Sequence, residues 1–138
     1  MTEDGATRSD LWGREWDFLA VDSAGHVAVL SSAGYGPIPE PVLAAREVVE
    51  RADDAIAALP TITRAVPESP RREGNLSDWY SLSERGLFAY DWRIWHGPYE
   101  RIASPAEPLV VDSLPDPVQA AARLLQIPYL FAGVAELH

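Results

Sequence analysis

The chain lacks both cysteine and lysine, and these two absences exclude several kinds of chemistry. Without cysteine there is no disulfide framework, no thiolate nucleophile and no cysteine-ligated zinc. Without lysine there is neither Schiff-base chemistry nor a Ser-x-x-Lys nucleophile. No apolar run approaches the ~20 residues that span a bilayer, and the polar, acidic N-terminus is unlike a secretory signal. We therefore expect a cytoplasmic protein without a membrane segment.

Acidic residues, in contrast, are abundant. Twenty-one aspartates and glutamates face eleven arginines, so the formal net charge is 11 − 21 = −10. Phosphate backbones and anionic membrane surfaces repel such a chain, which argues against nucleic acid and membranes as partners. The charge favours a basic protein partner, because complementary fields speed encounter. The alternative is that the acidic excess only keeps the protein in solution.

Length and composition indicate one domain. The chain has 138 residues, 47% of them apolar, which is enough to bury a single core. Residues 1–10 show no apolar periodicity, and we expect them to form a flexible N-terminal tail. We expect residues 11–138 to form a single α+β globular domain.

Local patterns predict a mostly antiparallel sheet with one long and two shorter helices packed on it. Alternating apolar residues and turn chemistry predict strands at 16–21, 26–32, 87–95, 99–104, 109–111 and 129–134. Apolar residues at three- and four-residue spacing, with proline and glycine at the ends, predict helices at 41–59, 75–86 and 113–126. Residues 60–74 are expected to be an exposed loop. The predicted order is ββ-α-α-βββ-α-β.

Motifs for metal, nucleotide or nucleophilic chemistry are weak. The histidines, His26, His96 and His138, are far apart, so we predict no metal site and no cofactor. The glycines at 34 and 36 precede a helix, but prolines at 37, 39 and 41 remove the N–H donors that a phosphate needs. No Gly-x-Ser-x-Gly motif occurs. Carboxylate pairs such as Asp91 and Glu100 leave acid–base catalysis open, yet chance pairs are numerous among so many acids. We lean towards a protein that is not an enzyme.

Two groups of residues are candidates for binding a partner. On the long helix, Glu50 lies three and four residues before Asp53 and Asp54, which gives an acidic face with little basic compensation. Around the second hairpin, aromatic residues stand among charged ones, as is typical of interface anchors. The predicted partner-binding residues are Glu47, Glu50, Asp53, Asp54, Asp91, Arg93, Trp95, Tyr99 and Tyr35.

The alternative function is that of a small enzyme or ligand-binding protein. Its pocket would lie between the sheet and the long helix, where aromatic residues from the middle of the chain are dense. The predicted lining residues are Tyr90, Trp92, Trp79 and His26. The competing interpretation of Tyr90 and Trp92 is ordinary core packing.

Several turn and core patterns resemble those of small bacterial proteins of the toxin-immunity type. The resemblance is carried by the segments Trp16-Asp-Phe-Leu-Ala-Val-Asp22, Gly25-His-Val-Ala-Val-Leu30, Gly34-Tyr-Gly-Pro-Ile-Pro39, Tyr90-Asp-Trp92, Gly97-Pro-Tyr99, Leu114-Pro115 and Phe131-Ala132. It spans most of residues 15–137 but brings no functional motif. It implies an acidic immunity protein that neutralises a basic toxin domain.

Overall fold

The computed structural model describes residues 16–34, 36–68, 76–93 and 97–137. The strands are β1 (Asp17–Val21), β2 (Val27–Ser31), β3 (Ala65–Pro67), β4 (Phe88–Asp91), β5 (Tyr99–Pro105) and β6 (Glu136–Leu137). The helices are α2 (Glu40–Leu43), α3 (Arg46–Ala57), α4 (Ser77–Glu84) and α5 (Asp116–Ala122), with the 3₁₀ helices η1 (Val111–Ser113) and η2 (Phe131–Gly133). The expected N-terminal tail lies outside the described residues.

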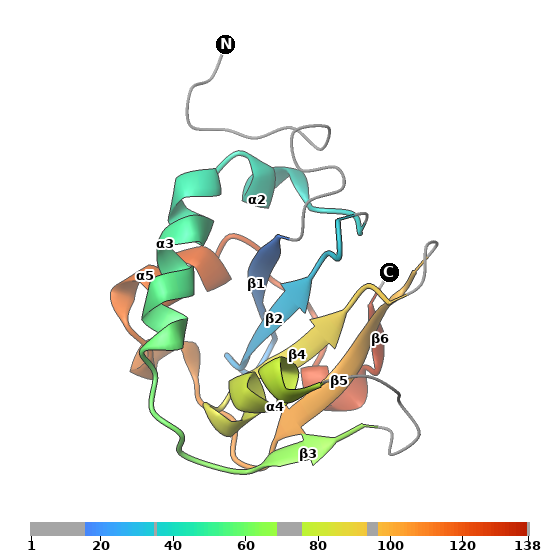
Figure 1. The fold of residues 1–138 in the computed structure, drawn as a ribbon. Helices are drawn as coiled ribbons and strands as arrows, with labels where there is room; N and C mark the ends of the chain where they lie inside the picture. The colour runs from blue at the N-terminus through green and yellow to red at the C-terminus, as the bar shows by residue number, and fades with distance from the viewer. Residues whose placement is uncertain (1–15, 35, 69–75, 94–96, 138) are drawn as a thin grey trace.

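The described strands form one mixed, mostly antiparallel sheet (Figure 1). Its order is β1-β2-β4-β5-β3. β3 pairs with the end of β5, and β6 pairs with the start of β5. The β2–β4 pair is parallel, and the other strand pairs are antiparallel. The predicted α+β class is therefore confirmed, as is the first hairpin.

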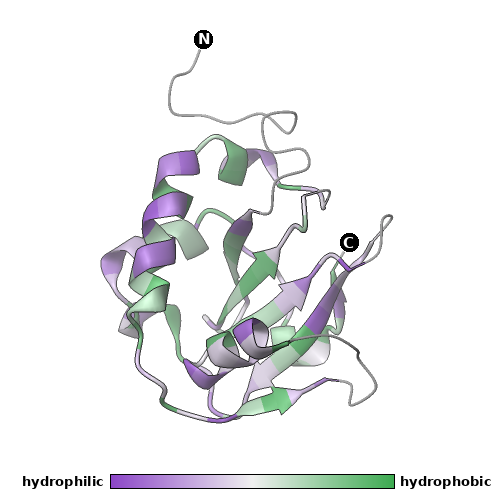
Figure 2. Cartoon of the chain, viewed as in Figure 1, coloured by the Kyte–Doolittle hydropathy of each residue, from purple (hydrophilic) through white to green (hydrophobic). Residues whose placement is uncertain are grey.

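Each face of the sheet is covered by a different part of the chain. On one face, β1 and β2 contribute Leu19 and Val29 to a core shared with α3, α4 and α5. On the other face, Phe18 and Leu30 pack with Phe131 and the rest of the C-terminal segment. This two-sided burial explains why β1 after Asp17 and β2 before Ser31 are apolar, whereas α3 carries hydrophilic residues between its apolar ones (Figure 2).

The prediction of one continuous helix over 41–59 is wrong. The chain leaves helical geometry at Ala45, where φ is −120° and ψ is 43°, so α2 and α3 are separate. Val42 and Leu43 pack in the core that contains Phe131, whereas Ala52 and Ile56 pack in the core on the other face. Val49 of α3 also packs in the core that contains Phe131, so α3 contributes to both cores, and the break at Ala45 separates it from α2.

Other boundaries also shift. The predicted loop over 60–74 contains the short strand β3, and the predicted strand over 109–111 is reduced to a bridge between His26 and Val110. The predicted helix over 113–126 is limited to α5. The predicted helix over 75–86 is confirmed as α4, and Gly86 follows it in the left-handed region with φ +92°.

The prediction of a strand over 129–134 is wrong, since this segment forms η2. The backbone of η2 bonds to side chains rather than to a neighbouring strand. Asp22 accepts from the Phe131 N–H, and Tyr90 donates to the Phe131 and Val134 carbonyls. Alternating apolar residues therefore suggested a strand where side-chain partners determine the conformation.

Candidate functional site

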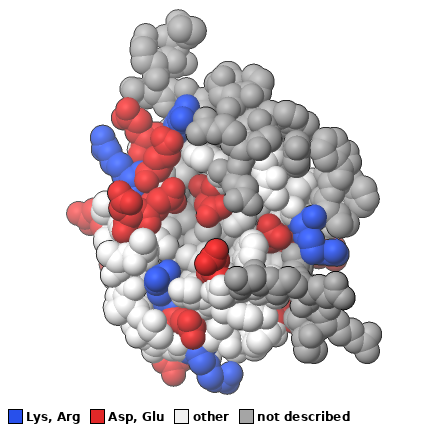
Figure 3. Space-filling view, in the orientation of Figure 1, with Lys and Arg blue, Asp and Glu red and all other residues white. Residues whose placement is uncertain are grey.

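Acidic side chains gather on the solvent face of α3. Val49, Ala52 and Ile56 are buried against the sheet. The residues on the rest of the helix surface include four exposed acids, Glu47, Glu50, Asp53 and Asp54. Figure 3 shows the resulting concentration of acidic side chains over α3. No basic residue lies in the last turn of α3, where a cation would favour the helix dipole.

Two arginines of the same helix partly compensate these acids. The Arg46 Nε lies 3.1 Å from the Glu50 Oε2, and an Arg51 guanidinium nitrogen lies 3.9 Å from the Glu47 Oε2. Ion pairs of this spacing on a helix surface contribute about 0.3–0.5 kcal/mol each. They hold two cations beside four acids, so the helix face keeps a negative balance.

Among the acids of α3, Asp53 has a clearly raised pKa. Its pKa is raised from 3.8 to about 6, first by partial burial of a residue that is exposed overall, then by the charges of Asp17, Glu50 and Asp54. Asp17 belongs to β1, so the repulsion joins a strand to a helix. The sequence prediction did not include Asp17 among the partner-binding residues, because only the packing of α3 beside β1 brings it there.

Further acids continue from Asp17 across the sheet. Asp17 is paired in register with Ser31, Ser31 with Asp91, and Asp91 with Glu100. Residues in cross-strand register share a face, and Asp17 shares that of Leu19, which is the face covered by α3. Figure 3 shows acidic atoms beyond α3, across the middle of this side of the molecule.

Arg93 lies at the end of this row of paired residues, next to Glu100. Its Nε donates to the Glu100 Oε2 at 2.7 Å, and this hydrogen bond, with the charges of Glu100 and Asp91, raises the pKa of the guanidinium. Like charges placed directly opposite, as in Asp91 and Glu100, are unfavourable in a sheet. We define the acidic surface as Asp17, Glu50, Asp53, Asp54, Asp91 and Glu100.

Tyr99, the predicted aromatic anchor that the structure describes, does not join this surface. Tyr99 is buried, its ring lies 5.8 Å from that of Phe18 and 4.9 Å from that of Trp92, and its hydroxyl donates to the Pro37 carbonyl at 3.0 Å. The prediction of Tyr99 as a partner contact is therefore wrong, because it is a core residue. Tyr35 and Trp95, the other two predicted anchors, lie outside the described residues.

The predicted pocket residues do not line a common space between the sheet and α3. Tyr90 is fully buried on the opposite face, and Trp92 packs on Tyr99. Trp79 is half-buried on α4, and the ring of His26 lies beside that of Phe88 at 6.1 Å. The side chains of α3 and α5 meet those of the sheet in a core instead.

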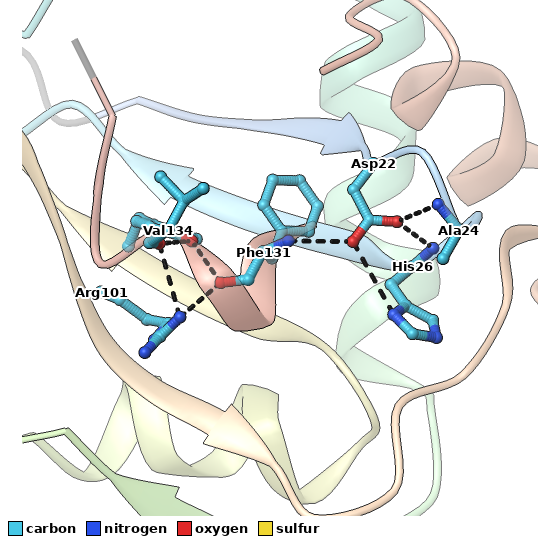
Figure 4. Close-up of polar contacts among 7 residues, drawn as sticks. Asp22, Ala24, His26, Arg101, Phe131 and Val134 are labelled. Atoms are coloured by element: carbon cyan, nitrogen blue, oxygen red, sulfur yellow. Dashed lines mark hydrogen bonds and ion pairs between the residues drawn. The ribbon is translucent and has the colours of Figure 1, made fainter. Parts of the chain in front are cut away.

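Polar side chains on this opposite face hold η2 at both ends (Figure 4). The buried Asp22 accepts from the N–H groups of Ala24, His26 and Phe131 at 2.8–3.0 Å. Its Oδ2 also lies 3.7 Å from the His26 Nδ1. These contacts fix the first hairpin turn to the start of η2.

At the other end of η2, Tyr90 and Arg101 donate to carbonyls. The Tyr90 hydroxyl donates to Val134 at 2.5 Å and to Phe131 at 3.2 Å, and Arg101 also donates to both. The guanidinium is paired with Glu68 at 3.0 Å. Burial raises the pKa of Tyr90 to about 12, so the hydroxyl stays a donor. We call Asp22, Tyr90 and Arg101 the η2 clamp.

A cavity of about 500 Å³ lies on the same face as the η2 clamp. Its lining is largely apolar and comes from β1, β2, β5, the segment before α2 and the C-terminal segment. The lining residues are Phe18, Leu30, Pro37, Ile38, Pro39, Tyr99, Leu125, Ile127, Pro128, Tyr129, Val134, Glu136 and Leu137.

Neither a metal centre nor a membrane-spanning helix occurs in the described part of the chain. No family model, curated protein or solved structure matches the sequence. The function has to be argued from the two features that the geometry offers, namely the acidic surface and the cavity.

Proposed function

We propose that the protein is a non-enzymatic binding protein whose acidic surface docks a basic protein. In the form that the sequence patterns favour, it is a cytoplasmic immunity protein that neutralises a toxin domain. The raised pKa of Asp53 is the observation that carries the proposal. Partial burial contributes most to this shift, and the charges of Asp17 on β1 and of Glu50 and Asp54 on α3 add to it, so these carboxylates repel one another.

Such repulsion lowers stability at neutral pH and would be relieved by cations from a partner. Like charges at helix spacing and in cross-strand register are each unfavourable by a few tenths of a kcal/mol. A surface that only needs to be soluble has no reason to bring these acids together from two elements. A binding surface has one, because a concentrated field steers a basic partner and disfavours wrong ones.

A toxin domain that acts on nucleic acid is one basic partner that fits this chemistry. Its substrate-binding surface has to attract phosphates, and it therefore carries arginine and lysine. Carboxylates spread over one helix and three strands would occupy such a surface in place of the nucleic acid.

The buried titratable groups favour binding over catalysis. The carboxylate of Asp22, the hydroxyl of Tyr90 and the guanidinium of Arg101 are occupied by backbone partners around η2. A general acid or base needs access to a substrate atom. These three groups serve the fold, so the enzyme alternative lacks an acid–base pair among them.

Association kinetics test the proposal. A partner is first captured on the immobilised full chain at low salt, released at high salt and identified. Its association rate is then measured with the wild type and with the triple variant Glu50→Gln/Asp53→Asn/Asp54→Asn. Electrostatic steering changes association rates by 10–10³-fold, so we expect the triple variant to associate at least about tenfold more slowly at low salt.

A second triple variant is the matched control. Glu107→Gln/Asp112→Asn/Asp116→Asn removes three exposed acids that are not part of the acidic surface and gives the same formal net charge, −10 + 3 = −7. We expect it to associate nearly as fast as the wild type. Equal slowing by both triple variants would reject a localised docking surface and leave only the total charge.

A further inference from the structure

The cavity on the face opposite α3 has the size and the walls of a small-molecule site. Its volume, about 500 Å³, lies within the range of ligand pockets in proteins. Phe18 and Leu30 form part of the sheet side, Ile38 lies beside α2, and Ile127 and Leu137 come from the C-terminal segment. The site is distinct from the acidic surface and does not depend on the proposed function.

The walls are held by hydrogen bonds that do not involve a ligand. The C-terminal segment is fixed to the end of β1, where Val21 donates to the Leu125 carbonyl at 3.0 Å and accepts from the Ile127 N–H at 2.8 Å. The Tyr99 hydroxyl holds Pro37 on the other side. The η2 clamp fixes the chain beyond Tyr129. A ligand would therefore enter a formed site without first ordering its walls.

The lining decides the chemical class of the ligand. Prolines at 37, 39 and 128 have no N–H group, and the hydroxyl of Tyr99 is already bonded to a carbonyl. Among the described residues that line the cavity, Glu136 is the one charged residue, on a chain of net charge −10. An anionic head group would meet repulsion from this carboxylate, whereas a neutral or cationic group would not.

Exposed apolar residues mark the mouth of the cavity. Tyr129, which lines it, is 61% exposed, and the neighbouring Leu130 is 48% exposed. Large exposed side chains beside an apolar cavity are typical of binding sites. A bound molecule would cover part of the Tyr129 ring.

We propose that this cavity binds a small hydrophobic molecule, neutral or cationic, of about the size of two or three linked aromatic rings. Fatty acids and other amphiphilic anions are disfavoured by Glu136. Binding would not require any of the acids on the opposite face.

Two fluorescent probes that share one apolar body test the proposal. N-phenyl-1-naphthylamine is neutral, and 1-anilinonaphthalene-8-sulfonate adds a sulfonate to the same body. With the full chain at low salt, we expect saturable fluorescence enhancement by the neutral probe and on the order of tenfold weaker binding of the sulfonate. The difference should narrow at high salt and in Glu136→Gln.

A cavity-filling variant and a matched control locate the site. Ile127→Trp places a large ring in the lining, and we expect it to weaken binding of the neutral probe at least tenfold. Ile62→Trp adds the same side chain at a 43% exposed position that is not in the lining, and it should bind as the wild type does. If Ile127→Trp lowers the melting temperature strongly, Leu137→Trp replaces it as the cavity-filling variant, with the same expected loss of binding.

Each outcome decides the proposal. Saturable binding of the neutral probe that is lost in Ile127→Trp or Leu137→Trp, and kept in Ile62→Trp, supports it. No saturable binding by the folded wild type overturns it, and so does equal binding by all variants. Tighter binding of the sulfonate than of the neutral probe overturns the assignment of ligand charge.

Discussion

The two faces of the sheet differ in how far their charged groups are matched by partners. On the face opposite α3, Asp22 accepts from three N–H groups, and Arg101 is matched by Glu68 and two carbonyls. On the α3 face, partial burial and then the charges of Asp17, Glu50 and Asp54 raise the pKa of Asp53. Charge is satisfied where it holds the fold together and is left in excess where the protein meets solvent.

This difference separates structural ionisable groups from candidate functional ones. A buried charge without partners would destabilise the fold by several kcal/mol, so the clamp residues had to be matched. Exposed charges are screened, so their mismatch is tolerated at a small cost. The small cost at Asp53 is consistent with a role in binding.

The largest expected effect concerns Asp22. In Asp22→Ala the N–H groups of Ala24, His26 and Phe131 lose their acceptor, and unsatisfied groups of this kind cost about 1–3 kcal/mol each. We expect a loss of about 3 kcal/mol in the free energy of unfolding, measured with urea. Asp112→Ala, in which an exposed carboxylate 2.5 Å from Arg123 is removed, should cost less than about 1 kcal/mol. Similar losses in both variants would contradict the distinction between matched and exposed charge.

A smaller loss is expected for Tyr90→Phe. The ring remains packed against Phe131 while the hydroxyl that donates to Val134 is removed. One such hydrogen bond contributes about 1 kcal/mol, so the urea midpoint should fall accordingly without a change in the slope of the transition. An unchanged midpoint would show that Arg101 alone satisfies these carbonyls.

Asp53→Asn should change stability in the other direction. The folded-state pKa, about 6, lies above the ordinary value of 3.8, so the folded protein binds this proton more tightly than the unfolded chain. The ionised carboxylate therefore destabilises the fold above pH 6, and stability is regained as the pH falls from about 6 towards 4.

Urea unfolding of the wild type and Asp53→Asn at pH 5 and pH 7.5 measures this effect. At pH 7.5 the variant should be more stable by about 0.5 kcal/mol, a figure that is discounted because solvent screens an exposed residue. The advantage should shrink at pH 5. If the variant is less stable than the wild type at pH 7.5, Asp53 is not destabilised by the neighbouring carboxylates.

The smallest change in stability is expected for Arg46→Gln. It removes the cation that lies 3.1 Å from Glu50, so stability should fall by about 0.3–0.5 kcal/mol. Association with a basic partner should become faster at low salt, because the negative field increases. A slower association, followed by stopped-flow fluorescence, would place Arg46 itself in the interface.

Features that depend on neighbouring residues in the chain were predictable from the sequence. The first hairpin follows from turn chemistry at Asp22–Gly25, and the end of α4 follows from Gly86. The alternation that places Phe88 and Tyr90 on one face of β4 is also correct. The acids of α3 were identified as an exposed group from their spacing alone.

Features that depend on the packing of distant segments were not predictable. The approach of Asp17 to Asp53 follows from the position of α3 over β1, and no local pattern encodes that position. The C-terminal segment was expected to pair as a strand, so neither the η2 clamp nor the cavity followed from the sequence. Tyr99 was misassigned because its partner Pro37 comes from a segment far away in the chain.

The pKa of the Asp53 carboxyl, followed by NMR in the free protein and in complex with the captured basic partner, tests the central claim most directly. We predict a value near 6 in the free protein and a clear decrease in the complex, because partner cations favour the ionised form. A pKa that is unchanged or higher in the complex would contradict the account, since the partner would then bring no positive charge to this surface.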